Sequence, residues 1–226
     1  MGGASLFWLA PAIPLLALIP EGLQHIAEIR LGMFESERAF RAHAFSPERM
    51  VFGVVKVIGL MLAILAAARF LGGAGKDWWR PSGIVWRAFW LALALNIVVS
   101  VSLVGAGMII EDRLASILNT IATIATLPLL VMLIAPLLGD ATMGLRRAFT
   151  AGWIHAIAMV LLAMIFLPTQ MLHEHFHTLA IGSSQQMVWL LMALDTLLVG
   201  LMGCLLGGAL AGGYTFGNRV TRAKST

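Results

Sequence analysis

The sequence predicts an all-α polytopic membrane protein, a bundle of about six transmembrane helices with a short amphipathic surface helix between the first two. Of the 226 residues, 60% are hydrophobic and only 12% are charged, and the mean hydropathy is +0.91. A chain with so few charged residues does not have enough polar groups to cover the surface of a soluble globule of this size. Six stretches also approach the roughly 20 apolar residues that a helix needs to cross about 30 Å of hydrocarbon. We expect residues 1–226 to form a single integral membrane domain.

The predicted spans follow one another with short connections. In order, they are 6–26, 50–71, 84–110, 114–138, 155–181 and 187–208. Three prolines interrupt the first stretch, and an interfacial or re-entrant first segment would remove one crossing. In segment 34–48, phenylalanines alternate with charged residues at near-helical spacing, which is typical of an amphipathic helix on the membrane surface.

The distribution of Lys and Arg predicts the orientation. Nine of the 15 lie on one side of this topology: Arg69, Lys76, Arg80, Arg87, Arg146, Arg147, Arg219, Arg222 and Lys224. The other side has Arg30, Arg38, Arg41, Arg49 and Arg113. Because short loops rich in Lys and Arg stay in the cytoplasm, we expect a cell (inner) membrane protein with both termini cytoplasmic, including the basic tail 214–226.

Composition also limits the partners. The net charge of +4 is scattered over the ends of apolar segments, so we expect a lipid bilayer as environment and no nucleic acid. Small residues on the sixth span allow another helix to approach closely, either within the chain, in a homo-oligomer or in a membrane-protein partner. They are Gly200, Gly203, Gly207, Gly208 and Gly212.

Ionisable residues inside the spans are the first candidates for a site, because a charge at mid-bilayer costs about 3 kcal/mol or more. Lys56 and Asp195 both lie about 10 Å deep, counted from the same side, so we expect an ion pair between them. This pair either links two helices or belongs to a proton or substrate relay. Glu21, His25 and Glu28 share one helix face and either line a polar cavity or form a solvated helix end.

The stretch LHEHFHTLAIG, residues 172–182, contains His173-Glu174-x-x-His177. On a helix, both histidines can bind one metal ion, and Glu174 can take a proton from metal-bound water. If the helix continues to Ile181 and turns at Gly182, His173 and Asp195 fall within about one turn of the same depth.

The run resembles the active-site helix of the site-2 family of intramembrane metalloproteases. The resemblance implies that His173 and His177 are zinc ligands, that Glu174 is the base, and that Asp195 on a later helix is the third ligand. The chain departs from that family at His175 and Phe176, where the family has small or aliphatic residues, and no glycine flanks Asp195.

Two function classes follow from these residues. The first is a small non-enzymatic membrane protein, either a transport or permeation component or a subunit of a membrane complex, with no cofactor. The second is a zinc-dependent intramembrane hydrolase with catalytic Glu174. Two further interpretations of the histidine-rich run are metal or proton binding without catalysis and a polar connection between two helices.

Overall fold

The computed structural model describes residues 2–107 and 112–223, and every regular element in those ranges is helical. The predicted all-α fold class is therefore confirmed. Contacts divide the chain into two compact units, unit 1 with Met1–Leu71 and Ala163–Gly208, and unit 2 with Gly72–Leu162 and Ala209–Thr226. The single membrane domain expected from the sequence stays a prediction.

Five helices in the described ranges are long and apolar enough to cross a membrane. α1 (Leu6–Leu9) and α2 (Ala12–Arg30) meet at a bend of 98°. If the two helices form one broken span, they add a sixth crossing. Ala10 leaves the helical region at φ −152° and ψ 65°, just before Pro11. The residue before a proline disfavours the helical conformation, and this breaks the predicted first span.

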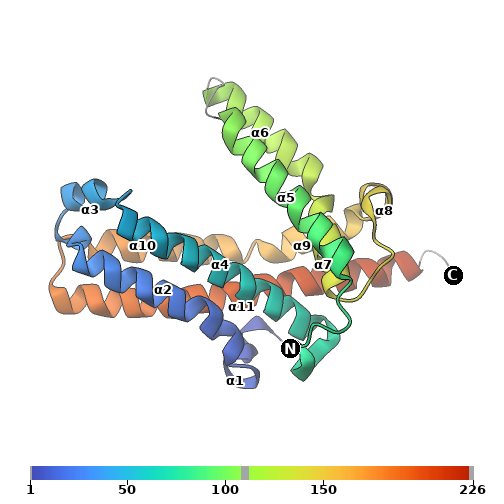
Figure 1. The fold of residues 1–226 in the computed structure, drawn as a ribbon, viewed down its shortest axis with the longest axis horizontal. Helices are drawn as coiled ribbons and strands as arrows, with labels where there is room; N and C mark the ends of the chain where they lie inside the picture. Colours follow the sequence, from blue (N-terminus) through green and yellow to red (C-terminus); the bar gives the residue numbers. More distant parts are fainter. Residues whose placement is uncertain (1, 108–111, 224–226) are drawn as a thin grey trace. The chain divides into compact units, whose positions relative to one another are not determined.

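The helices of unit 1 pack closely through small residues. Figure 1 shows α2, in blue, beside α4 (Pro47–Arg69), in teal. At Gly59 on α4, an added Cβ would lie 2.4 Å from the Leu16 carbonyl oxygen on α2. α10 (Phe166–Ala180) and the first part of α11 (Gln185–Ala223) complete the unit. Such contacts stabilise helix pairs in lipid, where van der Waals packing replaces the hydrophobic effect.

The predicted glycine face of the sixth span packs largely within unit 1. Gly200, Gly203 and Gly207 are buried, and their missing side chains make room for Leu18, Leu60 and Ala67. Gly208 faces Leu71, and Gly212 is exposed. The intramolecular alternative therefore accounts for three of these five glycines, while an external partner stays a prediction.

Apolar side chains cover the outside of unit 1 as well as its core. The core between α2, α4 and α11 contains Ala17, Ala63, Leu198, Val199 and Met202. On α4, large apolar residues such as Val51, Val54, Val57 and Ile58 are more than half exposed. A continuous exposed apolar face is expected where lipid is the surrounding solvent.

The predicted amphipathic segment 34–48 contains a shorter helix, α3 (Glu37–His43). Ser36 caps it by accepting a hydrogen bond from the Ala39 backbone N–H, and Pro47 begins α4. Phe34 is buried, whereas Phe45 is 85% exposed.

Unit 2 contains α5 (Trp86–Gly107), α6 (Asp112–Thr126), α7 (Pro128–Leu137), α8 (Leu145–Ala151), α9 (Trp153–Ala163) and the last part of α11. Figure 1 shows α5 and α6 side by side in green. The Asn96 side chain on α5 donates to the Leu129 carbonyl on α7 over 3.2 Å.

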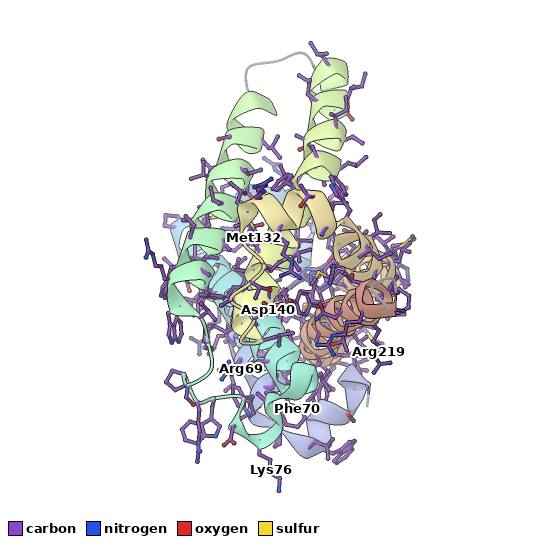
Figure 2. All side chains as sticks on the ribbon, turned by 90° about the vertical axis from the view of Figure 1, so that its right-hand side faces the viewer. Arg69, Phe70, Lys76, Met132, Asp140 and Arg219 are labelled. Atoms are coloured by element: carbon purple, nitrogen blue, oxygen red, sulfur yellow. The ribbon has the colours of Figure 1, made fainter. Side chains whose placement is uncertain are left out.

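Several predicted spans in this unit have different limits. The end of span 84–110 lies outside the described residues, and a break before Pro128 divides the fourth span into α6 and α7. The predicted tail is helical as far as Ala223, because α11 continues through it. Figure 2 labels Asp140, in the connection from α7 to α8, and Arg219, near the end of α11.

Candidate metal centre

Asp195 on α11 is completely buried, and both of its carboxylate oxygens face imidazoles. Oδ1 lies 2.7 Å from His173 Nδ1, and Oδ2 lies 3.0 Å from His25 Nε2 and 3.4 Å from His177 Nε2. These three histidines come from α2 and α10, so residues from three helices meet at one carboxylate. We call Glu21, His25, Glu28, His173, His177 and Asp195 the acid–histidine cluster.

The connection between α10 and α11 brings the histidines to the depth of Asp195. α10 ends at Ala180, and Gly182 then adopts φ +75°, a left-handed conformation that suits glycine after a helix. The Gly182 N–H donates to the Phe34 carbonyl over 2.8 Å, which fixes this turn against the segment after α2. The tight hairpin considered from the sequence is therefore present, and it places His173 and His177 against α11.

A second layer of polar groups holds His25. Its Nδ1 lies 3.2 Å from Glu28 Oε2, while Glu28 Oε1 accepts hydrogen bonds from Gln24 over 2.7 Å and from Arg49 over 2.9 Å. Arg49 also donates to the Ala44 carbonyl. A carboxylate behind a histidine fixes the ring orientation and tautomer, and this arrangement commonly supports metal-binding histidines.

The predicted ion pair between Lys56 and Asp195 has to be corrected. Lys56 Nζ lies 2.8 Å from Glu21 Oε1, because α4 packs against α2 at this level. Glu21 Oε1 is also 3.3 Å from His25 Nε2, so it connects Lys56 to the cluster. Asp195 has imidazoles as partners instead of an ammonium group.

Several of these side chains lie close enough together to hold a metal ion. Three overlapping sets have ligand atoms within 4.8 Å of one another: His173/His177/Asp195, Glu21/His25/Asp195 and His25/Glu28/His177. Two ligands of a tetrahedral zinc ion, each about 2.05 Å from the metal, lie roughly 3.4 Å apart. The separation of His177 from Asp195 is 3.4 Å, whereas His25 and His173 lie closer to this carboxylate, at 3.0 and 2.7 Å. His177 Nε2 is buried and lies 3.4 Å from Asp195 Oδ2, but it makes no hydrogen bond within the described residues, so its lone pair is available to a metal ion.

Glu174, the predicted catalytic base, lies on another face of α10. It is exposed, and its carboxylate accepts a hydrogen bond from Gln170 over 3.0 Å. None of the potential ligand sets among the described residues includes it. The HExxH pattern therefore contributes its two histidines to the cluster but not its glutamate.

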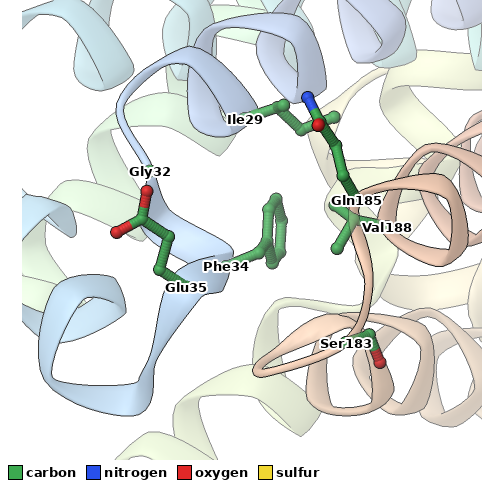
Figure 3. Close-up of a pocket in the computed structure, with 7 residues that line it drawn as sticks. All are labelled: Ile29, Gly32, Phe34, Glu35, Ser183, Gln185 and Val188. Carbon is green, nitrogen blue, oxygen red and sulfur yellow. The ribbon is translucent and has the colours of Figure 1, made fainter.

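The Phe34 ring lines a groove in unit 1 and also contacts a histidine of the cluster. The groove has a volume of about 350 Å³, and Figure 3 shows the Phe34 ring pointing into it between Ile29 and Val188. On its other side, Phe34 contacts the His177 ring, with the centroids 5.9 Å apart. His177 in turn contacts His25 and His173.

The structure brings together seven of the eight site residues predicted from the sequence and leaves Glu174 outside. It adds two residues that were not predicted as site residues, Gln24 and Arg49. Gln24 shares a helix face with Glu28, and Arg49 was used in the sequence analysis only to predict the orientation in the membrane. No protein-family model, curated protein or solved structure matches this chain. The geometry of the cluster is therefore the basis for assigning a function.

Proposed function

We propose that this protein is a small non-enzymatic membrane protein of the transport or permeation type, whose acid–histidine cluster binds a divalent transition-metal ion. The observation that carries this proposal is the fully buried Asp195 carboxylate with three imidazoles around it. Imidazole and carboxylate together suit zinc and related divalent metals, and zinc is our first candidate.

The charges around the cluster support a cation. Its three carboxyl groups, Glu21, Glu28 and Asp195, are completely buried. Glu21 pairs with Lys56 and Glu28 with Arg49, whereas Asp195 faces only imidazoles. Buried charges require compensation, because desolvation in the hydrocarbon is costly. With neutral imidazoles, three carboxylates and two basic side chains leave one negative charge, which favours a cation at the cluster.

Each group has a distinct role in this proposal. His173, His177 and Asp195 are the primary ligands, and His25 is the fourth, since its Nε2 faces Asp195 Oδ2. Glu28, with Gln24 and Arg49 behind it, orients His25. Lys56 compensates Glu21.

The intramembrane hydrolase remains the second candidate, because His173, His177 and a carboxylate do face one another. Exposed Glu174, paired with Gln170, is poorly placed to act on water bound at the cluster. A hydrolase would need its base from Glu21 or Glu28, both of which already face basic side chains.

For the setting, we propose a cell (inner) membrane with both termini on the cytoplasmic side. The excess of Lys and Arg in the connections on that side supports this orientation. Reporter fusions at the C-terminus and within segment 34–48 test it, and the opposite labelling pattern would refute it.

The metal content of detergent-purified protein tests the binding proposal. We expect about one equivalent of zinc, iron or manganese in the wild type and a large loss in His177→Ala and Asp195→Asn. His175→Ala is the matched control, because His175 is exposed on the same helix. Metal at background level in the wild type, or equal loss in His175→Ala, would overturn the proposal.

Movement of the ion is tested in vesicles that contain the purified protein and a zinc-sensitive dye. We expect zinc uptake with wild type and with Glu174→Gln, and no uptake with Asp195→Asn. Metal binding without uptake would favour a structural subunit. Peptide hydrolysis that Glu174→Gln abolishes would favour the hydrolase.

A further inference from the structure

Unit 2 contains a polar hollow of about 690 Å³, which the metal proposal does not use. The connection after α7, the α8 helix and the last turns of α11 form its walls. Its polar lining includes Asp140, Thr142, Arg147, Asn218, Arg219 and Arg222. The hollow therefore lies where the apolar parts of two predicted spans end.

The one carboxylate of the hollow is occupied by neighbours within the unit. Asp140 accepts hydrogen bonds from the Tyr214 hydroxyl and from both the backbone N–H and the hydroxyl of Thr142, the latter two over 2.7 Å. It therefore compensates the surrounding arginines only in part. Arg147, Arg219 and Arg222 line the hollow together with this one acid, so its lining has more positive than negative side chains.

The arginines keep donors for a ligand. Arg147 uses one guanidinium nitrogen to donate to Thr142 over 2.7 Å, which orients the side chain. Arg219 is exposed, and no side chain in the described ranges pairs with it. A guanidinium group presents several N–H donors in a planar fork that matches the oxygens of a phosphate group.

We propose that this hollow binds a phosphate group, with Arg147 and Arg219 as its main donors. Its volume is far larger than a phosphate ion needs and suits the headgroup of an anionic phospholipid. Its place at the ends of apolar helices is also where lipid phosphates lie. A soluble phosphate compound shares this chemistry. The inference concerns unit 2 and does not depend on metal binding in unit 1.

The test uses the full chain, purified in micelles that contain either phosphatidylglycerol or phosphatidylcholine, with retained lipid counted by mass spectrometry after washing. We expect the wild type to retain phosphatidylglycerol preferentially. Arg219→Gln should weaken this retention about tenfold, as the loss of a charge-assisted hydrogen bond predicts. Because Arg219 is exposed and unpaired within the described residues, this variant should fold normally.

Arg146→Gln is the matched control. It removes one arginine charge from α8, next to Arg147, but Arg146 does not line the hollow. Inorganic phosphate that binds and displaces the lipid would support the site and show that a soluble phosphate can also occupy it. Inorganic phosphate that binds when no lipid is retained would support a soluble source. Equal retention of both lipids together with no phosphate binding, or an equal effect of Arg146→Gln and Arg219→Gln, would overturn the proposal.

Discussion

His25 on α2 and Asp195 on α11 lie 3.0 Å apart, although 170 positions separate them in the chain. Both residues are buried, so this contact joins the first long helix to the last one inside unit 1. His25 also faces Glu28 through its other ring nitrogen. The imidazole therefore links two carboxylates from different helices, and its loss should disturb both.

The pairing of Lys56 with Glu21 predicts strong energetic coupling between these two residues. Lys56→Met should destabilise the protein by about 3 kcal/mol, because it leaves the buried Glu21 carboxylate without its ammonium partner. Adding Glu21→Gln should recover part of this loss, with a coupling energy of about 1–3 kcal/mol. Unfolding in a denaturing detergent measures these values. A larger coupling of Lys56 with Asp195 would contradict the assignment.

Gly207→Ala should destabilise unit 1 by about 1–3 kcal/mol, because the new Cβ would lie 2.4 Å from the Ile64 carbonyl oxygen. Gly212→Ala is the control on the same helix, where the nearest atom is 3.5 Å away. Thermal midpoints of the two variants should separate clearly. Equal midpoints would show that α4 and α11 are less closely packed than described.

Removal of metal should lower the thermal midpoint of the wild type. A ligand present at 100 times its dissociation constant stabilises the folded state by about 2.7 kcal/mol. A chelator should therefore lower the midpoint of wild type and of His175→Ala, but leave Asp195→Asn unchanged. A wild-type midpoint that responds to neither zinc nor chelator would count against the metal centre.

Asp140 predicts a dependence of stability on pH. Burial alone would raise the pKa of Asp140, but hydrogen bonds from Tyr214 and Thr142 outweigh burial and lower it. A lowered pKa in the folded state stabilises the protein above the ordinary aspartate value of about 4, and this stabilisation is lost as the pH falls through the folded-state pKa.

Tyr214→Phe tests this prediction, because it removes one donor and keeps the ring that contacts His155. The variant should be less stable than wild type at about pH 7, by at most about 1 kcal/mol since Asp140 is partly exposed. The difference in thermal midpoint should shrink towards about pH 3. A difference that is constant over this range would exclude Asp140 as its source.

Contacts within one helix could be predicted from the sequence. Glu21, His25 and Glu28 share a face, and His173 and His177 lie one turn apart, because the helical repeat fixes these spacings. Contacts between helices could not be predicted in the same way. Lys56 and Asp195 were correctly placed inside apolar spans, but their partners depend on how each helix is rotated about its axis. In lipid, apolar residues cover both sides of a helix, so hydropathy gives little information on that rotation.

Helix limits were also only partly predictable. Hydropathy detects apolar stretches, but it does not detect the breaks at Pro11 and Pro128, where the chain stays apolar while the backbone changes direction or loses hydrogen bonds. Hydropathy also does not detect a helix that continues beyond its apolar part, so the polar end of α11 was predicted as a tail although the helix continues to Ala223.

The break between α1 and α2 has a consequence for the depth of the acid–histidine cluster. With α2 along the membrane normal, the 98° bend lays α1 in the plane of the interface. Leu6 is buried against the protein and Trp8 is 87% exposed, so in this placement we expect Trp8 to lie at the interface. Glu21 then lies about 14 Å below the start of α2, close to the bilayer centre. In this placement, a four-residue helix that contributes no ligand determines how deep Glu21 and the cluster around it lie.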